Sequence, residues 1–148
     1  MNEKLKSSVF WYYWLMSAIS VVMLISICMI IMPNLTIKGF SLLIYSQSNT
    51  IESSFSSNAL KYIELTHAVL GAVMFGWSIL LLLILVGPFR KGNLESWYYM
   101  TISIVAWFVS DTLFSLSKGF WQNAILNSFL FILLIMPLLA VRKEFIRN

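Results

Sequence analysis

Residues 61–86 read KYIELTHAVLGAVMFGWSILLLLILV, and this stretch decides the fold. Its last 19 residues, from Ala68 to Val86, contain no ionisable side chain. About 20 apolar residues cross the hydrocarbon core of a bilayer as an α-helix. The stretch is followed by Gly87-Pro88, a pair that ends helices. It therefore predicts a transmembrane helix over residues 61–86.

Three further apolar runs have a similar length. They cover residues 9–32, 96–116 and 121–141. The first run is longer than the apolar core of a signal peptide, about 7–15 residues, and we interpret it as a retained helix. Only 11% of the 148 residues are charged, against about 25% in soluble domains. We therefore expect an all-α integral membrane four-helix bundle that forms a single transmembrane domain.

Residues 33–60 interrupt the apolar pattern. Residues 33–58 contain seven serines and few charges. We predict a long outer loop over 33–60, with room for a short interfacial helix or hairpin near residues 39–46.

The lysines and arginines predict the orientation in the membrane. With four spans, the N-terminus, the 87–95 turn and the C-terminus share one side, which carries seven of them, and the other side carries three. Cytoplasmic segments hold the excess of such residues. We therefore expect both termini in the cytoplasm and the protein in a bacterial inner membrane. The seven are Lys4, Lys6, Arg90, Lys91, Arg142, Lys143 and Arg147, and the three are Lys38, Lys61 and Lys118.

Strongly polar side chains within the spans are the candidate functional residues. Because ionisable groups are costly in hydrocarbon, each needs a partner or a function. At a rise of 1.5 Å per residue, His67, Asp111 and Asn127 lie at a similar depth in the outer half of the membrane. One hypothesis is a polar pocket that binds an amphipathic ligand or handles protons. The other is a structural contact between helices. The candidate residues are Glu64, His67, Asp111, Asn123, Asn127 and Trp107.

Several chemistries are not supported. Glu64 and His67 match one E-x-x-H motif, whereas di-metal carboxylate bundles need two such motifs, and His67 is the single histidine, so we expect no metal and no other cofactor. A lone cysteine, Cys28, excludes an internal dithiol pair. No basic helix points to nucleic acid. Enzymatic activity stays a lesser alternative, in the form of a membrane-embedded isomerase.

Small residues on the second span predict close helix packing. Ala68, Ala72 and Gly76 recur at four-residue steps, with Gly71 beside them. Small residues let two helix backbones approach closely in a membrane. The expected partners are the lipid bilayer, neighbouring helices of the bundle, a second copy of the chain or a larger membrane complex.

The second half of the chain also resembles a known family. The pattern His67-x3-Gly71-x4-Gly76-Trp77, then Pro88-x-Arg90 and Trp107-x3-Asp111, resembles the small four-helix membrane proteins of the DoxX/BphX-like type over residues 62–136. The resemblance implies the four-helix bundle and matches Gly71, Gly76, Arg90 and Asp111, without assigning a role to any of them. The expected function is a small-molecule or proton-handling membrane protein, and the alternative is a non-catalytic accessory subunit.

Overall fold

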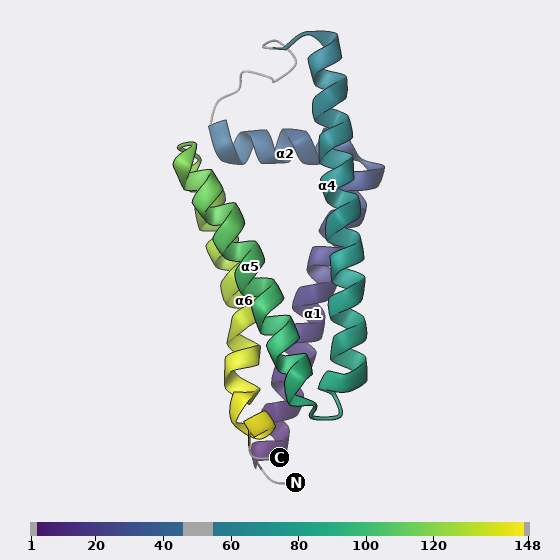
Figure 1. The fold of residues 1–148 in the computed structure, drawn as a ribbon. Coiled ribbons are helices and arrows are strands. Elements are labelled where there is room, and N and C mark those ends of the chain that lie inside the picture. Colours follow the sequence, from purple (N-terminus) through teal and green to yellow (C-terminus); the bar gives the residue numbers. More distant parts are fainter. Residues whose placement is uncertain (1–2, 46–54, 147–148) are drawn as a thin grey trace. The chain divides into compact units, whose positions relative to one another are not determined.

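The computed structural model describes residues 3–45 and 55–146, and within these ranges the regular structure is entirely helical. Figure 1 shows the helices in chain order. They are α1 (Glu3–Ile31), α2 (Pro33–Tyr45), α4 (Ser57–Ile84), the π-helical η1 (Leu85–Phe89), α5 (Leu94–Ser117) and α6 (Trp121–Ile146).

Four of these segments are long and apolar enough to cross a membrane. They are Val9–Ile31, Ser57–Phe89, Leu94–Ser117 and Trp121–Ile146. The four predicted spans are thus confirmed as long apolar helices. All four helices extend beyond the predicted bounds: α1 begins at Glu3 rather than residue 9, α4 at Ser57 rather than 61 and α5 at Leu94 rather than 96, and α6 continues to Ile146 rather than ending at 141. The pair Gly87-Pro88 does not end the second span, because the chain continues through it to Phe89 as the π-helical η1.

The segment predicted as an outer loop begins with a helix. Pro33 is the first residue of α2, a position where its missing N–H costs nothing, because first-turn N–H groups have no helical partner. Of the seven serines in this region only Ser41 lies in α2, so the polar composition belongs to the residues after it. The helix begins earlier than the 39–46 prediction, and residues 46–54 lie outside the described part of the chain.

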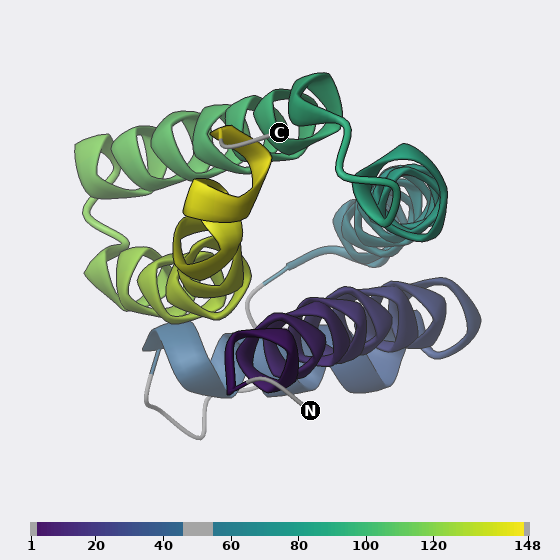
Figure 2. The same ribbon diagram turned by 90° about the horizontal axis from the view of Figure 1, so that it is seen from below.

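The chain divides into two compact units, which we describe separately. Unit 1 comprises Met1–Ser20 and Ile79–Asn148, and unit 2 comprises Val21–Ser78. In unit 1, α5 and α6 form an antiparallel hairpin (Figure 2). Phe108 of α5 stacks on Phe131 of α6 with ring centroids 4.1 Å apart. The core of this unit is apolar and includes Leu15, Ile19, Leu85, Met100, Ile104, Leu134 and Leu138.

A hydrogen bond from α1 ends on a carbonyl of α6 that a proline leaves without its helical donor. Pro137 has no N–H, so the Leu133 carbonyl lacks the donor that an α-helix would supply four residues later. The indole Nε1 of Trp14 donates to this carbonyl at 3.1 Å. Trp97 of α5 similarly donates to the Leu138 carbonyl at 2.8 Å. Two indole N–H groups thus connect neighbouring helices to backbone carbonyls of α6 through hydrogen bonds.

Unit 2 is built on close packing of α1 against α4. A Cβ atom added to Gly71 would lie 2.8 Å from Met29 Cβ and 3.0 Å from the Ser26 carbonyl oxygen. Both distances are shorter than van der Waals contact, so only glycine permits this approach of the two helices. Within the same unit, α2 runs across the direction of α4 (Figure 1).

Candidate functional site

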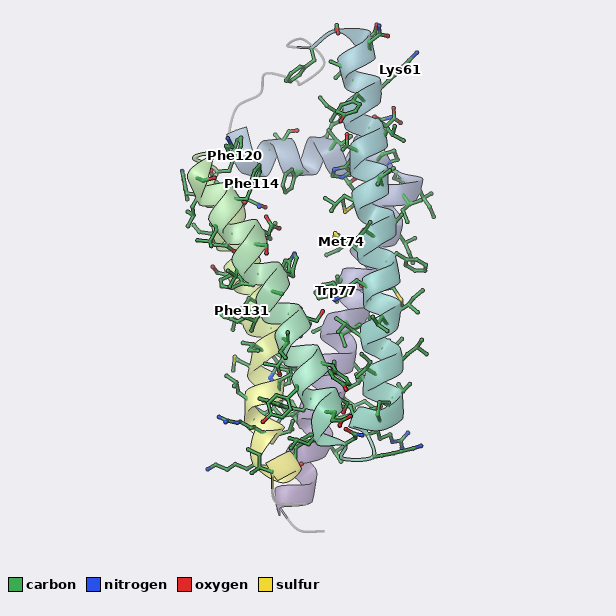
Figure 3. The ribbon with its side chains drawn as sticks, viewed as in Figure 1. Lys61, Met74, Trp77, Phe114, Phe120 and Phe131 are labelled. Carbon is green, nitrogen blue, oxygen red and sulfur yellow. The ribbon has the colours of Figure 1, made fainter. Side chains whose placement is uncertain are left out.

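A hydrogen-bonded polar cluster joins α5 to α6 near the turn that connects them. Gly119 has φ of 81°, in the left-handed region that favours glycine, and it reverses the chain so that α6 returns along α5. Asn123 Nδ2 then donates to Asp111 Oδ1 at 3.1 Å and to Ser115 Oγ at 2.7 Å. Ser115 Oγ donates to Asp111 Oδ1 at 3.2 Å. Phe114 and Phe120 mark this end of the hairpin in Figure 3.

The Asp111 carboxylate in this cluster is held through one of its two oxygens. Both hydrogen bonds end on Oδ1, and neither involves Oδ2. Asp111 itself is half-buried, whereas Ser115 is only 4% exposed. A carboxylate can accept about four hydrogen bonds, two at each oxygen. Oδ2 therefore keeps acceptor capacity that these two neighbours do not use.

Asn127 lies one helical turn beyond Asn123 on the same face of α6. Its side chain is 3% exposed, and its Nδ2 has no hydrogen-bond partner within the part of the chain that the structure describes. Buried polar groups nearly always have partners, so this amide carries an uncompensated cost of burial. Thr112 Oγ1 on α5 is orphaned in the same way.

In unit 2, the two predicted site residues on α4, Glu64 and His67, form hydrogen bonds with α2. His67 Nε2 lies 2.9 Å from Thr36 Oγ1, and the His67 ring lies 6.5 Å from that of Phe40, measured between centroids. The Thr36 hydroxyl also donates to the Pro33 carbonyl at 3.0 Å. A hydroxyl has one proton, so with this bond made His67 Nε2 must be the donor to Thr36. Asn34 Nδ2 donates to Glu64 Oε1 at 3.5 Å.

The predicted site residues thus fall into two sets, one in each unit. Glu64 and His67 belong to unit 2, and the other four belong to unit 1. The structure pairs Asp111 with Asn123, and Trp107 is half-buried with an interaction of its own. The convergence of all six in one pocket stays a prediction.

Three partners were missed by the sequence reasoning. Ser115 follows Asp111 by four residues, which places both on one helix face, and this spacing could have identified it. Asn34 and Thr36 lie in the segment that we predicted to be a loop. Its helical form gives these two residues fixed positions against α4.

The small residues of α4 differ in their surroundings. Gly71 lies at the contact with α1. At Gly76, an added Cβ would meet nothing within 4 Å among the described residues. Ala72 is exposed and Ala68 half-buried. The close approach inside unit 2 is therefore carried by Gly71, and a seam through Ala68, Ala72 and Gly76 stays a prediction.

Within the described ranges, no three His, Cys, Asp or Glu side chains lie close enough to hold a metal ion. Comparison with protein-family models, curated proteins and solved structures finds no match to this chain. The resemblance of residues 62–136 to DoxX/BphX-like proteins stays a prediction carried by the residues alone.

Proposed function

We propose that this chain is a small membrane protein that binds the polar head of an amphipathic molecule at the Asp111 cluster, without chemical conversion. The observation that carries the proposal is the use of Asp111 Oδ1 alone by Asn123 and Ser115. Oδ2 can then accept a hydrogen bond or a proton from a ligand.

A hydroxyl group fits this requirement, because it can donate a hydrogen bond to Oδ2. An alcohol or phenol with an apolar tail would place its hydroxyl at Asp111 and its tail against the apolar surface of α5 and α6. Exposed apolar side chains on this hairpin include Leu113, Phe129 and Ile132. We further propose that both termini face the cytoplasm, which places the cluster in the outer leaflet.

The test uses the purified full-length chain in lipid nanodiscs with two probes of equal chain length, a long-chain alcohol and its methyl ether. We expect the alcohol, but not the ether, to raise the melting temperature. Asp111→Asn should abolish this difference, and Ser128→Ala should keep it. Ser128 is a suitable control because its hydroxyl bonds the Ala124 carbonyl of its own helix. Equal effects of both probes on the unmodified chain would refute ligand recognition through the hydroxyl.

A second candidate function is that of a non-catalytic subunit of a larger membrane complex. It is favoured by a specific observation, namely that the contacts of Asp111, Glu64 and His67 each join two helices. Such contacts hold membrane helices together. In this case neither probe would stabilise the chain, and extraction in a mild detergent would recover it in a particle larger than a monomer or dimer.

A further inference from the structure

A cavity of about 290 Å³ lies at the end of unit 1 opposite the Asp111 cluster. It is formed by the first turns of the apolar part of α1, the turn after η1 and the last turns of α6. None of the residues of the Asp111 cluster lines it. The cavity is therefore separate from the site of the proposed function.

The turn between η1 and α5 determines where one wall of this cavity lies. Pro88 cannot donate to the Ile84 carbonyl, and the helix widens so that Arg90 N donates to the Leu85 carbonyl at 3.2 Å. Gly92, with φ of 75°, then reverses the chain. Asn93 caps α5 by accepting from the N–H groups of Glu95 and Ser96. This turn places Arg90 at the rim of the cavity.

The deeper wall of the cavity is apolar and fixed. Phe89 and Phe145 are 6% and 7% exposed, with ring centroids 4.6 Å apart, and Val141 is buried beside them. Such a wall suits the glycerol and first methylene groups of a lipid.

The outer wall carries two opposite charges and two phenols. Arg90 and Glu144 both line the cavity and both are exposed, as is Tyr13, whereas Tyr12 is half-buried. A guanidinium matches a phosphate through paired N–H donors. A carboxylate accepts hydrogen bonds from a primary ammonium group, and nearby aromatic faces attract cations. Glu144 also takes part in an interaction within the chain, and a carboxylate, which can accept about four hydrogen bonds, can bind the ammonium group in addition.

The cavity also lies at the level of lipid headgroups. Val9 begins the first candidate span and Phe89 ends the second, and the cavity touches both. Its volume lies just below the range of about 300–1,000 Å³ for pockets that enclose whole small molecules. A phospholipid needs only its headgroup to enter, because its acyl chains remain in the bilayer.

We propose that this cavity binds the headgroup of a zwitterionic phospholipid with a primary ammonium group, with the phosphate at Arg90 and the ammonium at Glu144. Phosphatidylethanolamine has this chemistry. Phosphatidylglycerol lacks the ammonium group, and the quaternary nitrogen of phosphatidylcholine cannot donate a hydrogen bond to Glu144.

The experiment is a native mass spectrometry titration of the full-length chain with these three lipids, all with identical acyl chains. We expect phosphatidylethanolamine to bind about tenfold more tightly than the other two, the factor for one charge-assisted hydrogen bond. Arg90→Gln should weaken the binding of phosphatidylethanolamine and of phosphatidylglycerol equally, by about tenfold. Glu144→Gln should lower the affinity for phosphatidylethanolamine to that for phosphatidylglycerol. The affinity for phosphatidylglycerol itself should not change.

The matched control is Lys91→Gln, which removes a neighbouring exposed cation that does not line the cavity. It should leave all three affinities unchanged, whereas Arg90→Lys should restore part of the loss seen with Arg90→Gln. Circular dichroism establishes that each variant is folded before titration. The assignment is overturned by equal binding of the three lipids, by a Lys91→Gln effect as large as that of Arg90→Gln, or by soluble glycerophosphoethanolamine binding as tightly as the lipid.

Discussion

Trp14 of α1 donates its indole N–H to the Leu133 carbonyl, the group that Pro137 leaves without a donor in α6. A proline inside a helix usually weakens it, because one backbone hydrogen bond is lost. In this chain the carbonyl group that lost its helical donor accepts a hydrogen bond from another helix. The proline therefore contributes to tertiary structure as well as removing a hydrogen bond from its own helix.

Trp14→Phe should lower the free energy of unfolding by about 0.5–1.5 kcal/mol, because it removes this hydrogen bond while keeping an aromatic ring. In a Pro137→Ala background the helix supplies its own donor to Leu133, so the same substitution should cost less. Unfolding in detergent micelles, analysed as a double-mutant cycle, measures the difference. Trp121→Phe is the control, since Trp121 is exposed on α6. Identical costs in both backgrounds would contradict this link.

Gly71→Ala should destabilise the chain by about 1–3 kcal/mol, because the new methyl group would force α1 and α4 apart. The matched control is Gly76→Ala on the same helix, where a Cβ meets nothing within 4 Å among the described residues. That change should be neutral or slightly stabilising, since alanine favours helices over glycine. Thermal melting of the two variants in one detergent gives the comparison. Equal melting temperatures would show that Gly71 does not limit the approach of α1.

Asp111→Leu should cost about 1–3 kcal/mol of stability, because Asn123 Nδ2 loses an acceptor in a half-buried setting. Asp111→Asn should cost less, since its amide oxygen can still accept from Asn123. Chemical unfolding followed by tryptophan fluorescence measures both. A larger loss for Asp111→Asn than for Asp111→Leu would mean that the cluster does not stabilise the hairpin.

Asn127→Leu should raise stability by about 1–3 kcal/mol, because a buried amide without a partner for Nδ2 carries an uncompensated desolvation cost. The melting temperatures of the variant and of the unmodified chain, measured in one detergent, test this. A lower melting temperature for the variant would show that Asn127 contributes to the packing of α6.

His67→Leu should loosen α2, because Thr36 Oγ1 loses its partner on α4. Hydrogen–deuterium exchange in residues 33–42 should rise, while exchange in the α5–α6 hairpin should not change. Thr66→Ala is the neighbouring control, since the Thr66 hydroxyl bonds the Tyr62 carbonyl of its own helix. Uniform changes across the chain would indicate general destabilisation rather than release of α2.

The sequence predicts the four long helices because each apolar run is about as long as a bilayer is thick. It predicts which polar residues need partners, since their cost follows from residue type alone. It does not predict that Asn123 faces Asp111, because that depends on the rotation of α5 and α6 about the turn at Gly119. The start of the α2 helix was predicted too late, near residue 39 rather than at Pro33, because serines beyond the helix dominated the composition of the whole segment.

The attachment of Trp14 to Leu133 also has a consequence for biosynthesis. The two residues are 119 positions apart, so the acceptor is made long after the donor. At about 5–20 residues per second, the ribosome needs roughly 6–24 s to cover this distance. During that interval the acceptor for the indole N–H of the first helix has not yet been synthesised. A nascent chain truncated before α6 should therefore be a substrate for membrane chaperones and quality-control proteases.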